Sequence, residues 1–67
     1  MRTLRTLATR LREMREEKGW SQERLAREAK ITRVYINRLE TRKQDPRLTV
    51  VARLAQALKV KIGDLVD

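Results

Sequence analysis

The sequence predicts an all-α fold in which five short helices surround one compact core. Apolar residues recur every three or four positions along most of the chain, which is the spacing of amphipathic helices. No stretch alternates apolar and polar residues for long enough to form a strand. The 67 residues include neither Cys nor His, so we expect a single domain, residues 1–67, that folds without a disulfide or a metal.

The first helix is expected over residues 4–18, followed by Gly19, which favours the end of a helix. Its apolar stripe consists of Leu4, Leu7, Leu11 and Met14. The segment contains no continuous apolar run, so it predicts neither a signal peptide nor a membrane span.

The second and third helices are each preceded by a residue that favours the N-cap position. Ser21 precedes a helix that begins at Gln22, and Thr32 precedes one that runs to about Glu40. The joint between them contains Lys30, at a position where the turn needs a positive φ. The inward positions of the two helices are Leu25, Ala26, Ala29, Ile36 and Leu39.

The fourth helix has two possible starts. It begins at Asp45 with Pro46 in its first turn, or later with Thr49 as the N-cap. Either start leaves a basic loop after Glu40 and the same apolar stripe, formed by Val51, Leu54, Ala55 and Leu58. A short fifth helix is expected over residues 62–66, where Lys61 occupies the position before the first turn.

Residues 22–40 have the spacing of a helix-turn-helix, in which two helices are joined by a three-residue turn. Ala26 supplies the small side chain that the close approach of the helices requires. The second helix of this motif can enter the DNA major groove. The spacing therefore predicts DNA binding through residues 32–40.

The distribution of charge supports a nucleic-acid partner. The net charge is +8, and half of this excess lies in residues 30–47, which contain six cations and two acids. A basic segment of this kind favours polyanionic partners. We therefore expect the chain to bind double-stranded DNA.

The outward face of residues 32–40 carries side chains suited to reading bases. Arg forms paired hydrogen bonds with guanine, Asn pairs with adenine, and Val contacts a thymine methyl group. The predicted base-reading residues are Arg33, Val34, Asn37 and Arg38.

Several segments in the right order make the chain similar to the Xre family of lambdoid phage repressors and Cro proteins. The resemblance rests on LREMREEKGW, SQERLA, TRVYINRLE, DPRLTVVARLAQALKV and IGDLV. It implies a lambda-repressor-like DNA-binding domain. It also implies that Gln22 bonds a phosphate and braces the first reading side chain.

The resemblance further implies contacts with the DNA backbone and an ion pair that braces the fold. The backbone contacts fall on Gln22, Thr32, Tyr35, Thr41, Arg42 and Lys43. Tyr35 has two expected roles, because its ring can pad the first helix while its hydroxyl reaches a phosphate. Arg15 and Glu40 are expected to pair at the surface, where such a pair contributes at most about 1 kcal/mol.

Together these observations predict a sequence-specific transcriptional regulator, a repressor or controller encoded by a bacterium or phage and acting in the cytoplasm. One recognition helix covers few base pairs, so we expect a homodimer on a pseudo-palindromic operator. The candidate dimer contacts, which could equally be core residues, are Val60, Ile62 and Leu65.

An alternative is a protein-interaction adaptor or antitoxin-type module with the same fold and weak DNA binding. No constellation of a nucleophile with a base, or of metal ligands, can be assembled from the sequence. We therefore expect no enzyme activity, no metal or other cofactor and no small-molecule ligand.

Overall fold

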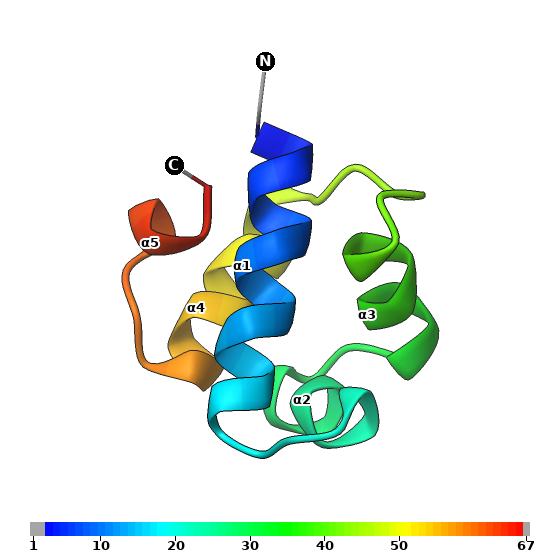
Figure 1. Cartoon of the computed structure of the whole chain (residues 1–67), viewed down its shortest axis with the longest axis vertical. Helices are drawn as coiled ribbons and strands as arrows, with labels where there is room; N and C mark the ends of the chain where they lie inside the picture. Colours follow the sequence, from blue (N-terminus) through cyan, green and yellow to red (C-terminus); the bar gives the residue numbers. More distant parts are fainter. Residues whose placement is uncertain (1–2, 67) are drawn as a thin grey trace.

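The computed structural model describes the backbone of residues 3–66 and the side chains of residues 7–66. It confirms the all-α class, and within the described residues there is no strand. The helices are α1 (Thr3–Glu17), α2 (Gln22–Ala29), α3 (Arg33–Glu40), α4 (Leu48–Leu58) and α5 (Ile62–Val66). α1 runs through the middle of the molecule and packs against α3 on one side and α5 on the other, while α2 packs against α3 and α4 (Figure 1).

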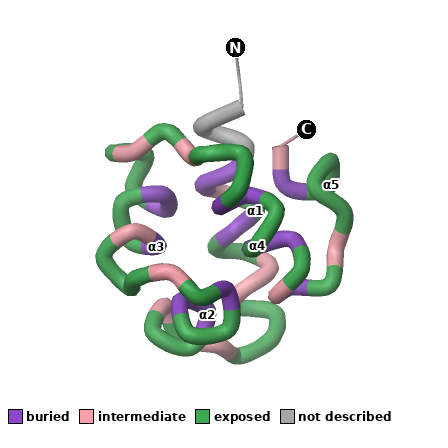
Figure 2. Tube along the Cα trace, turned by 180° about the vertical axis from the view of Figure 1, so that it is seen from behind, coloured by how far each residue is buried: buried purple, intermediate pink, exposed green. Residues whose placement is uncertain are grey.

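One hydrophobic core holds the helices together, and each of them contributes to it (Figure 2). The stripe predicted on α1 is buried at Leu7 and Leu11, and Met14 packs against the core; the side chain of Leu4 lies outside the described residues. The inward positions predicted for α2, α3 and α4 are buried, and Val50 joins them. The helical period therefore identified most of the core.

Both predicted N-caps are present. The Ser21 Oγ accepts a hydrogen bond from the backbone N–H of Arg24 at 3.0 Å. The Thr32 Oγ1 accepts one from the backbone N–H of Tyr35 at 3.1 Å. Each cap satisfies a backbone donor that the first turn of a helix leaves without a partner.

The first four helices end in the same way, with a residue of positive φ. These residues are Gly19, Lys30, Arg42 and Lys59. In each case the next residue donates its backbone N–H to the carbonyl five positions earlier, as Ile31 does to Ala26 at 2.9 Å, which is the Schellman motif. The positive φ expected at Lys30 is confirmed, at 61°. Three of the four positions carry a cation where glycine is the unstrained choice.

Both predicted starts of the fourth helix are wrong. α4 begins at Leu48, and Arg47 is its N-cap without a side-chain hydrogen bond. Asp45 and Pro46 lie in the preceding loop, and Thr49 lies inside the first turn. The predictions considered only residues that favour the N-cap position. Val50 and Val51 are buried in the core, and we infer that their packing determines where the first turn of α4 begins.

α5 is tied to its surroundings by Asp64. The Asp64 carboxylate accepts a hydrogen bond from the backbone N–H of Lys61 at 3.0 Å, which compensates for the missing cap side chain at that position. The backbone carbonyl of Asp64 accepts a bond from Arg10 of α1 at 2.9 Å. Leu65 is thereby turned into the core and is 0% exposed. Of the two alternatives left open for this residue, Leu65 is therefore a core residue, whereas Ile62 is 40% exposed.

Candidate nucleic-acid interface

α3 has one buried face and one exposed face. Ile36 and Leu39 are fully buried, while the four predicted base-reading side chains point away from the core and are exposed. Val34 is 58% exposed although it is apolar. The predicted base-reading residues, Arg33, Val34, Asn37 and Arg38, are therefore brought together on one surface, which we call the α3 surface.

Arg38 is partly held by the loop that follows α3. Its Nε donates a hydrogen bond to the Oε1 of Gln44 at 3.3 Å. The bond uses one edge of the guanidinium, and the donors on the two terminal nitrogens stay available for a second partner. A guanidinium oriented in this way is suited to a paired contact with guanine.

Gln22, the first residue of α2, contacts α3 with both ends of its amide. Its Nε2 donates to the Oε1 of Glu40 at 3.0 Å, and its Oε1 accepts from the Nδ2 of Asn37 at 3.4 Å. The family resemblance implied that Gln22 braces the first reading side chain. In this structure the reading side chain to which Gln22 is hydrogen-bonded is instead Asn37, one helical turn further along.

Arg15 and Glu40 form a bidentate ion pair between α1 and the end of α3, with distances of 2.8 Å and 3.1 Å. Their side chains are only 12% and 3% exposed, so the expectation of a surface pair is wrong. The hydrogen bond to Glu40 raises the pKa of Arg15 above its ordinary value. Arg15 also donates to the carbonyl of Trp20 at 2.7 Å, so the pair links α1, the start of α2 and α3.

Tyr35 does not present its hydroxyl to solvent. Its ring packs against the core, and the hydroxyl oxygen is buried without a hydrogen-bond partner among the described residues. A phosphate cannot reach a buried oxygen unless the side chain moves. Of the two roles expected for Tyr35, padding of the core agrees with this position, and the backbone contact does not.

The other residues predicted to contact the DNA backbone differ in whether they have a hydrogen-bond donor free for a phosphate. Thr41 donates both its hydroxyl and its backbone N–H to the carbonyl of Asn37, at 2.8 Å and 2.9 Å, so it has no donor left for a phosphate. Arg42 and Lys43 are exposed at the end of α3, and Arg42 has a φ of 63°. The hydroxyl of Thr32 accepts the cap bond and keeps its own proton free to donate.

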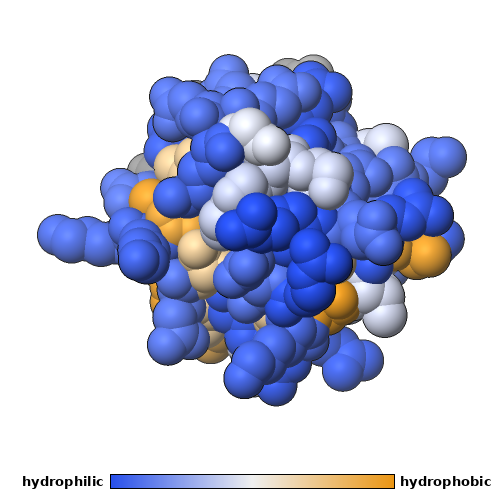
Figure 3. All heavy atoms as spheres, turned by 90° about the horizontal axis from the view of Figure 1, so that it is seen from below, coloured by the Kyte–Doolittle hydropathy of each residue, from blue (hydrophilic) through white to orange (hydrophobic). Residues whose placement is uncertain are grey.

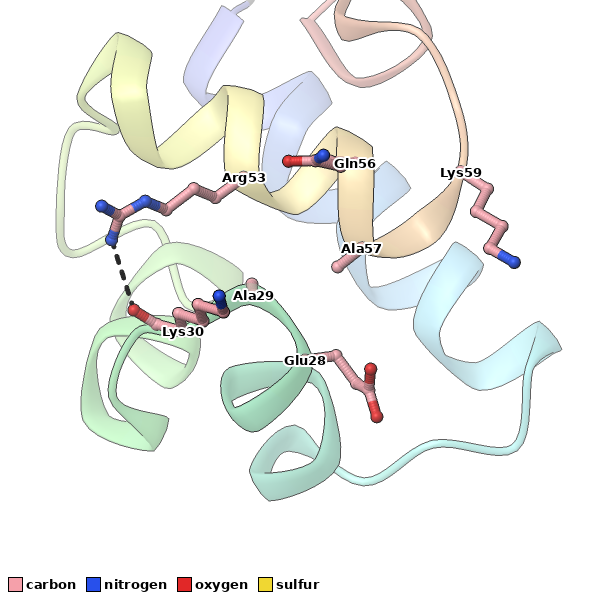
Figure 4. A pocket seen from close by; sticks show the side chains of 7 residues that line it. All are labelled: Glu28, Ala29, Lys30, Arg53, Gln56, Ala57 and Lys59. Carbon is pink, nitrogen blue, oxygen red and sulfur yellow. Dashed lines mark hydrogen bonds between the residues drawn. The ribbon is translucent and has the colours of Figure 1, made fainter.

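A second feature of the surface lies between the C-terminal ends of α2 and α4. It is an open hollow of about 540 Å³ whose walls include Lys30, Arg53 and Lys59 (Figure 4). Arg53 reaches across it to the carbonyl of Lys30 at 3.4 Å. The hollow shares no residue with the α3 surface. Seen from the α2 end, the molecule is mostly hydrophilic, with small separate apolar patches (Figure 3).

Two further findings concern only the described part of the chain. Within residues 3–66, no group of three or more His, Cys, Asp or Glu side chains is placed to hold a metal ion. No helix in that range is both long and apolar enough to cross a bilayer.

Comparison with protein families gives a match to the helix-turn-helix family model over residues 11–65. A curated relative, a hypothetical transcription factor from Neisseria meningitidis serogroup B, is 39% identical over 54 residues. The match covers 81% of this chain and 51% of the relative, so the chain spans about half the length of that protein.

Solved structures of regulators have the same fold. The restriction-modification controller protein C.AhdI from Aeromonas hydrophila superposes with a TM-score of 0.90 and 34% identity, over 97% of this chain and 98% of that one. The clp gene regulator ClgR from Corynebacterium glutamicum superposes with a TM-score of 0.84 and 27% identity, over 92% of this chain and 67% of that one.

Proposed function

This chain belongs to the helix-turn-helix family, and we propose that it is a DNA-binding transcriptional regulator that reads an operator through α3. The observation that carries the proposal is the α3 surface. Its four side chains are exposed and match the chemistry of base edges, while the opposite face of the same helix anchors it in the core. The named relatives are a hypothetical transcription factor, a gene regulator and a controller protein.

In this proposal the α3 surface enters the major groove. Arg33 and Arg38 read guanine, Asn37 reads adenine, and Val34 contacts a thymine methyl group. Arg15 and Glu40 do not touch DNA; they hold α3 against α1 at the angle that docking requires.

Contacts with phosphates position the helix in the groove. The residues with free donors are Gln22, Thr32, Arg42 and Lys43. Arg42 and Lys43 extend the positive charge beyond the end of α3, where a DNA strand would pass. Tyr35 and Thr41 are left out, because the hydroxyl of Tyr35 is buried and the donors of Thr41 are used within α3.

The proposed active form is a homodimer on a pseudo-palindromic operator, with half-sites one helical turn, about 34 Å, apart. The joint between α4 and α5 is the proposed dimer surface, with the half-buried Val60 and the exposed Ile62 as its apolar contacts. We further propose that the chain acts as a repressor or controller in the bacterial cytoplasm, and the fold that it shares with the controller protein C.AhdI supports the controller role.

Selection of bound duplexes from a randomised DNA pool, at about 150 mM salt to suppress non-specific binding, tests the proposal. We expect an enriched inverted repeat with guanines at symmetric positions. Arg33→Ala should then cost about 1–3 kcal/mol at one base pair and relax the preference there. Equal, small losses on every sequence would instead identify an adaptor that binds DNA only weakly.

A further inference from the structure

A chain of hydrogen bonds runs from α1 to the α3 surface through Glu40, which is buried, and Gln22, which is half-buried. The guanidinium of Arg15 binds both carboxylate oxygens of Glu40, Glu40 accepts from Gln22, and Gln22 accepts from Asn37. We call these four residues, Arg15, Glu40, Gln22 and Asn37, the α1–α3 network. Asn37 is its only member on the α3 surface.

The first part of the network sets the orientation of the Gln22 amide. The Glu40 side chain is 3% exposed, and both of its carboxylate oxygens accept hydrogen bonds from Arg15. A carboxylate paired in this way has no donor to offer, so it can only accept from Gln22. Gln22 must therefore turn its NH₂ group toward Glu40. The two ends of an amide differ in chemistry, so its oxygen must point the other way, toward Asn37.

The same reasoning sets the orientation of Asn37. Because the Gln22 oxygen can only accept, Asn37 must direct its NH₂ group to it. One N–H of Asn37 is used in this bond, and the Oδ1 acceptor and the second N–H remain. An acceptor beside a donor is the pair that an asparagine presents to the N6 and N7 atoms of adenine.

From this arrangement we propose that Glu40, a positioning residue that does not contact DNA, sets the base preference of Asn37 through Gln22. Glu40 determines which end of the Gln22 amide faces Asn37, and thereby which end of the Asn37 amide faces the groove. The inference rests on the proposed function, because it concerns the base that the α3 surface reads.

The test compares the duplexes selected by the wild-type chain with those selected by three variants. Asn37→Ala identifies the base pair that Asn37 reads, by the loss of an adenine preference. Gln22→Met removes both amide bonds at similar side-chain length, and Glu40→Gln allows the Gln22 amide to turn over. Both should lower the adenine preference at that base pair by a factor of about five or more, and leave the guanine preferences unchanged. Gln56→Met, on exposed α4 surface, is the matched control and should change no preference.

A readout without DNA separates this inference from the proposed function. The side-chain NH₂ resonances of Asn37 in a ¹⁵N NMR spectrum should shift in Gln22→Met. They should also shift in Glu40→Gln, although Glu40 is not bonded to Asn37. If the wild-type chain enriches no sequence, the proposed function fails, and these spectra still decide whether the network orients Asn37.

Two outcomes would overturn the inference while leaving the regulator intact. One is an Asn37→Ala variant that changes no base preference. The other is an adenine preference that depends on Asn37 and survives in Gln22→Met or in a folded Glu40→Gln variant. Gln22→Met is expected to fold, because Gln22 is half-exposed at the start of α2, and it tests the Gln22–Asn37 step whatever the stability of Glu40→Gln.

Discussion

The guanidinium of Arg15 donates two hydrogen bonds to the carboxylate of Glu40 and so holds α1 against the end of α3. The two residues are 25 positions apart in the sequence. The Glu40 side chain is 3% exposed, so its charge depends on Arg15 for compensation. Removing one partner from such a pair leaves an uncompensated charge in a poorly solvated position.

Arg15→Ala should therefore lower the free energy of unfolding by about 3 kcal/mol. Thermal and urea unfolding, followed by the fluorescence of Trp20, measures the change. The matched control is Glu28→Gln, which breaks the exposed pair between Arg24 and Glu28 and should cost less than about 0.5 kcal/mol. Equal losses in the two variants would show that burial adds nothing to the Arg15–Glu40 pair.

Tyr35→Phe should stabilise the protein. The variant removes a buried hydroxyl that has no partner among the described residues and keeps the ring in the core. We expect a gain of about 1 kcal/mol in the free energy of unfolding, with operator affinity unchanged. Thr32→Val removes a hydroxyl that does have a partner, the N-cap bond of α3, and should lose about 1 kcal/mol. A loss of operator affinity in Tyr35→Phe would instead show that the Tyr35 hydroxyl contacts a phosphate when DNA is bound.

Lys59→Gly should also stabilise the protein, because Lys59 ends α4 with a φ of 60°. Glycine adopts this conformation without strain, and the gain should exceed the extra entropy that glycine has in the unfolded chain. We expect a net gain of about 0.5 kcal/mol in urea unfolding. Gln56→Gly, three residues earlier inside the helix, should instead lose about 1 kcal/mol. A gain in the free energy of unfolding for Lys59→Gly and a loss for Gln56→Gly would show that the effect comes from the left-handed backbone at Lys59. Losses in both variants would contradict it.

Lys43→Ala should weaken binding to every DNA sequence by a similar factor. If Lys43 neutralises one phosphate, the slope of log affinity against log salt should fall in magnitude by about one. Titrations at several salt concentrations measure the slope. Lys59→Gly removes a charge at the far end of α4 and should leave the slope unchanged. The same slope in Lys43→Ala and the wild type would place Lys43 outside the interface.

Ile62→Glu should weaken the proposed dimer without unfolding the subunit, because Ile62 is 40% exposed. In a two-fold symmetric interface the new carboxylates lie close to each other and repel. We expect the dimer to dissociate about tenfold more readily in sedimentation equilibrium, which is about 1.4 kcal/mol. The control is Leu48→Glu, since Leu48 is 74% exposed at the opposite end of α4. If Leu48→Glu dissociates the dimer and Ile62→Glu does not, the interface lies at the N-terminal end of α4 instead.

The placement of the helices was largely predictable because it depends on local chemistry. Ser21 and Thr32 cap the backbone immediately beside them, and Lys30 and Gly19 end the helix that precedes them. The same holds for the exposed face of α3, because a period of 3.6 residues assigns buried and outward positions once the apolar residues are known.

Contacts between distant segments were not predictable, since no local pattern encodes them. Sequence alone did not show that Gln22 is hydrogen-bonded to Asn37, that the hydroxyl of Tyr35 is buried, or that Leu65 turns inward beneath α1. The start of α4 belongs to the same group, because the packing of Val50 and Val51 overrides the cap signals nearby.

By itself, the sequence determined the helical class, the helix-turn-helix at residues 22–40 and the side chains on the outward face of α3, because all of these follow from spacing along one chain. Only the tertiary structure decided which of the candidate contact residues keep a free donor and how the amide of Asn37 is oriented. Those properties depend on which groups meet across α1, α2 and α3 after the core has closed.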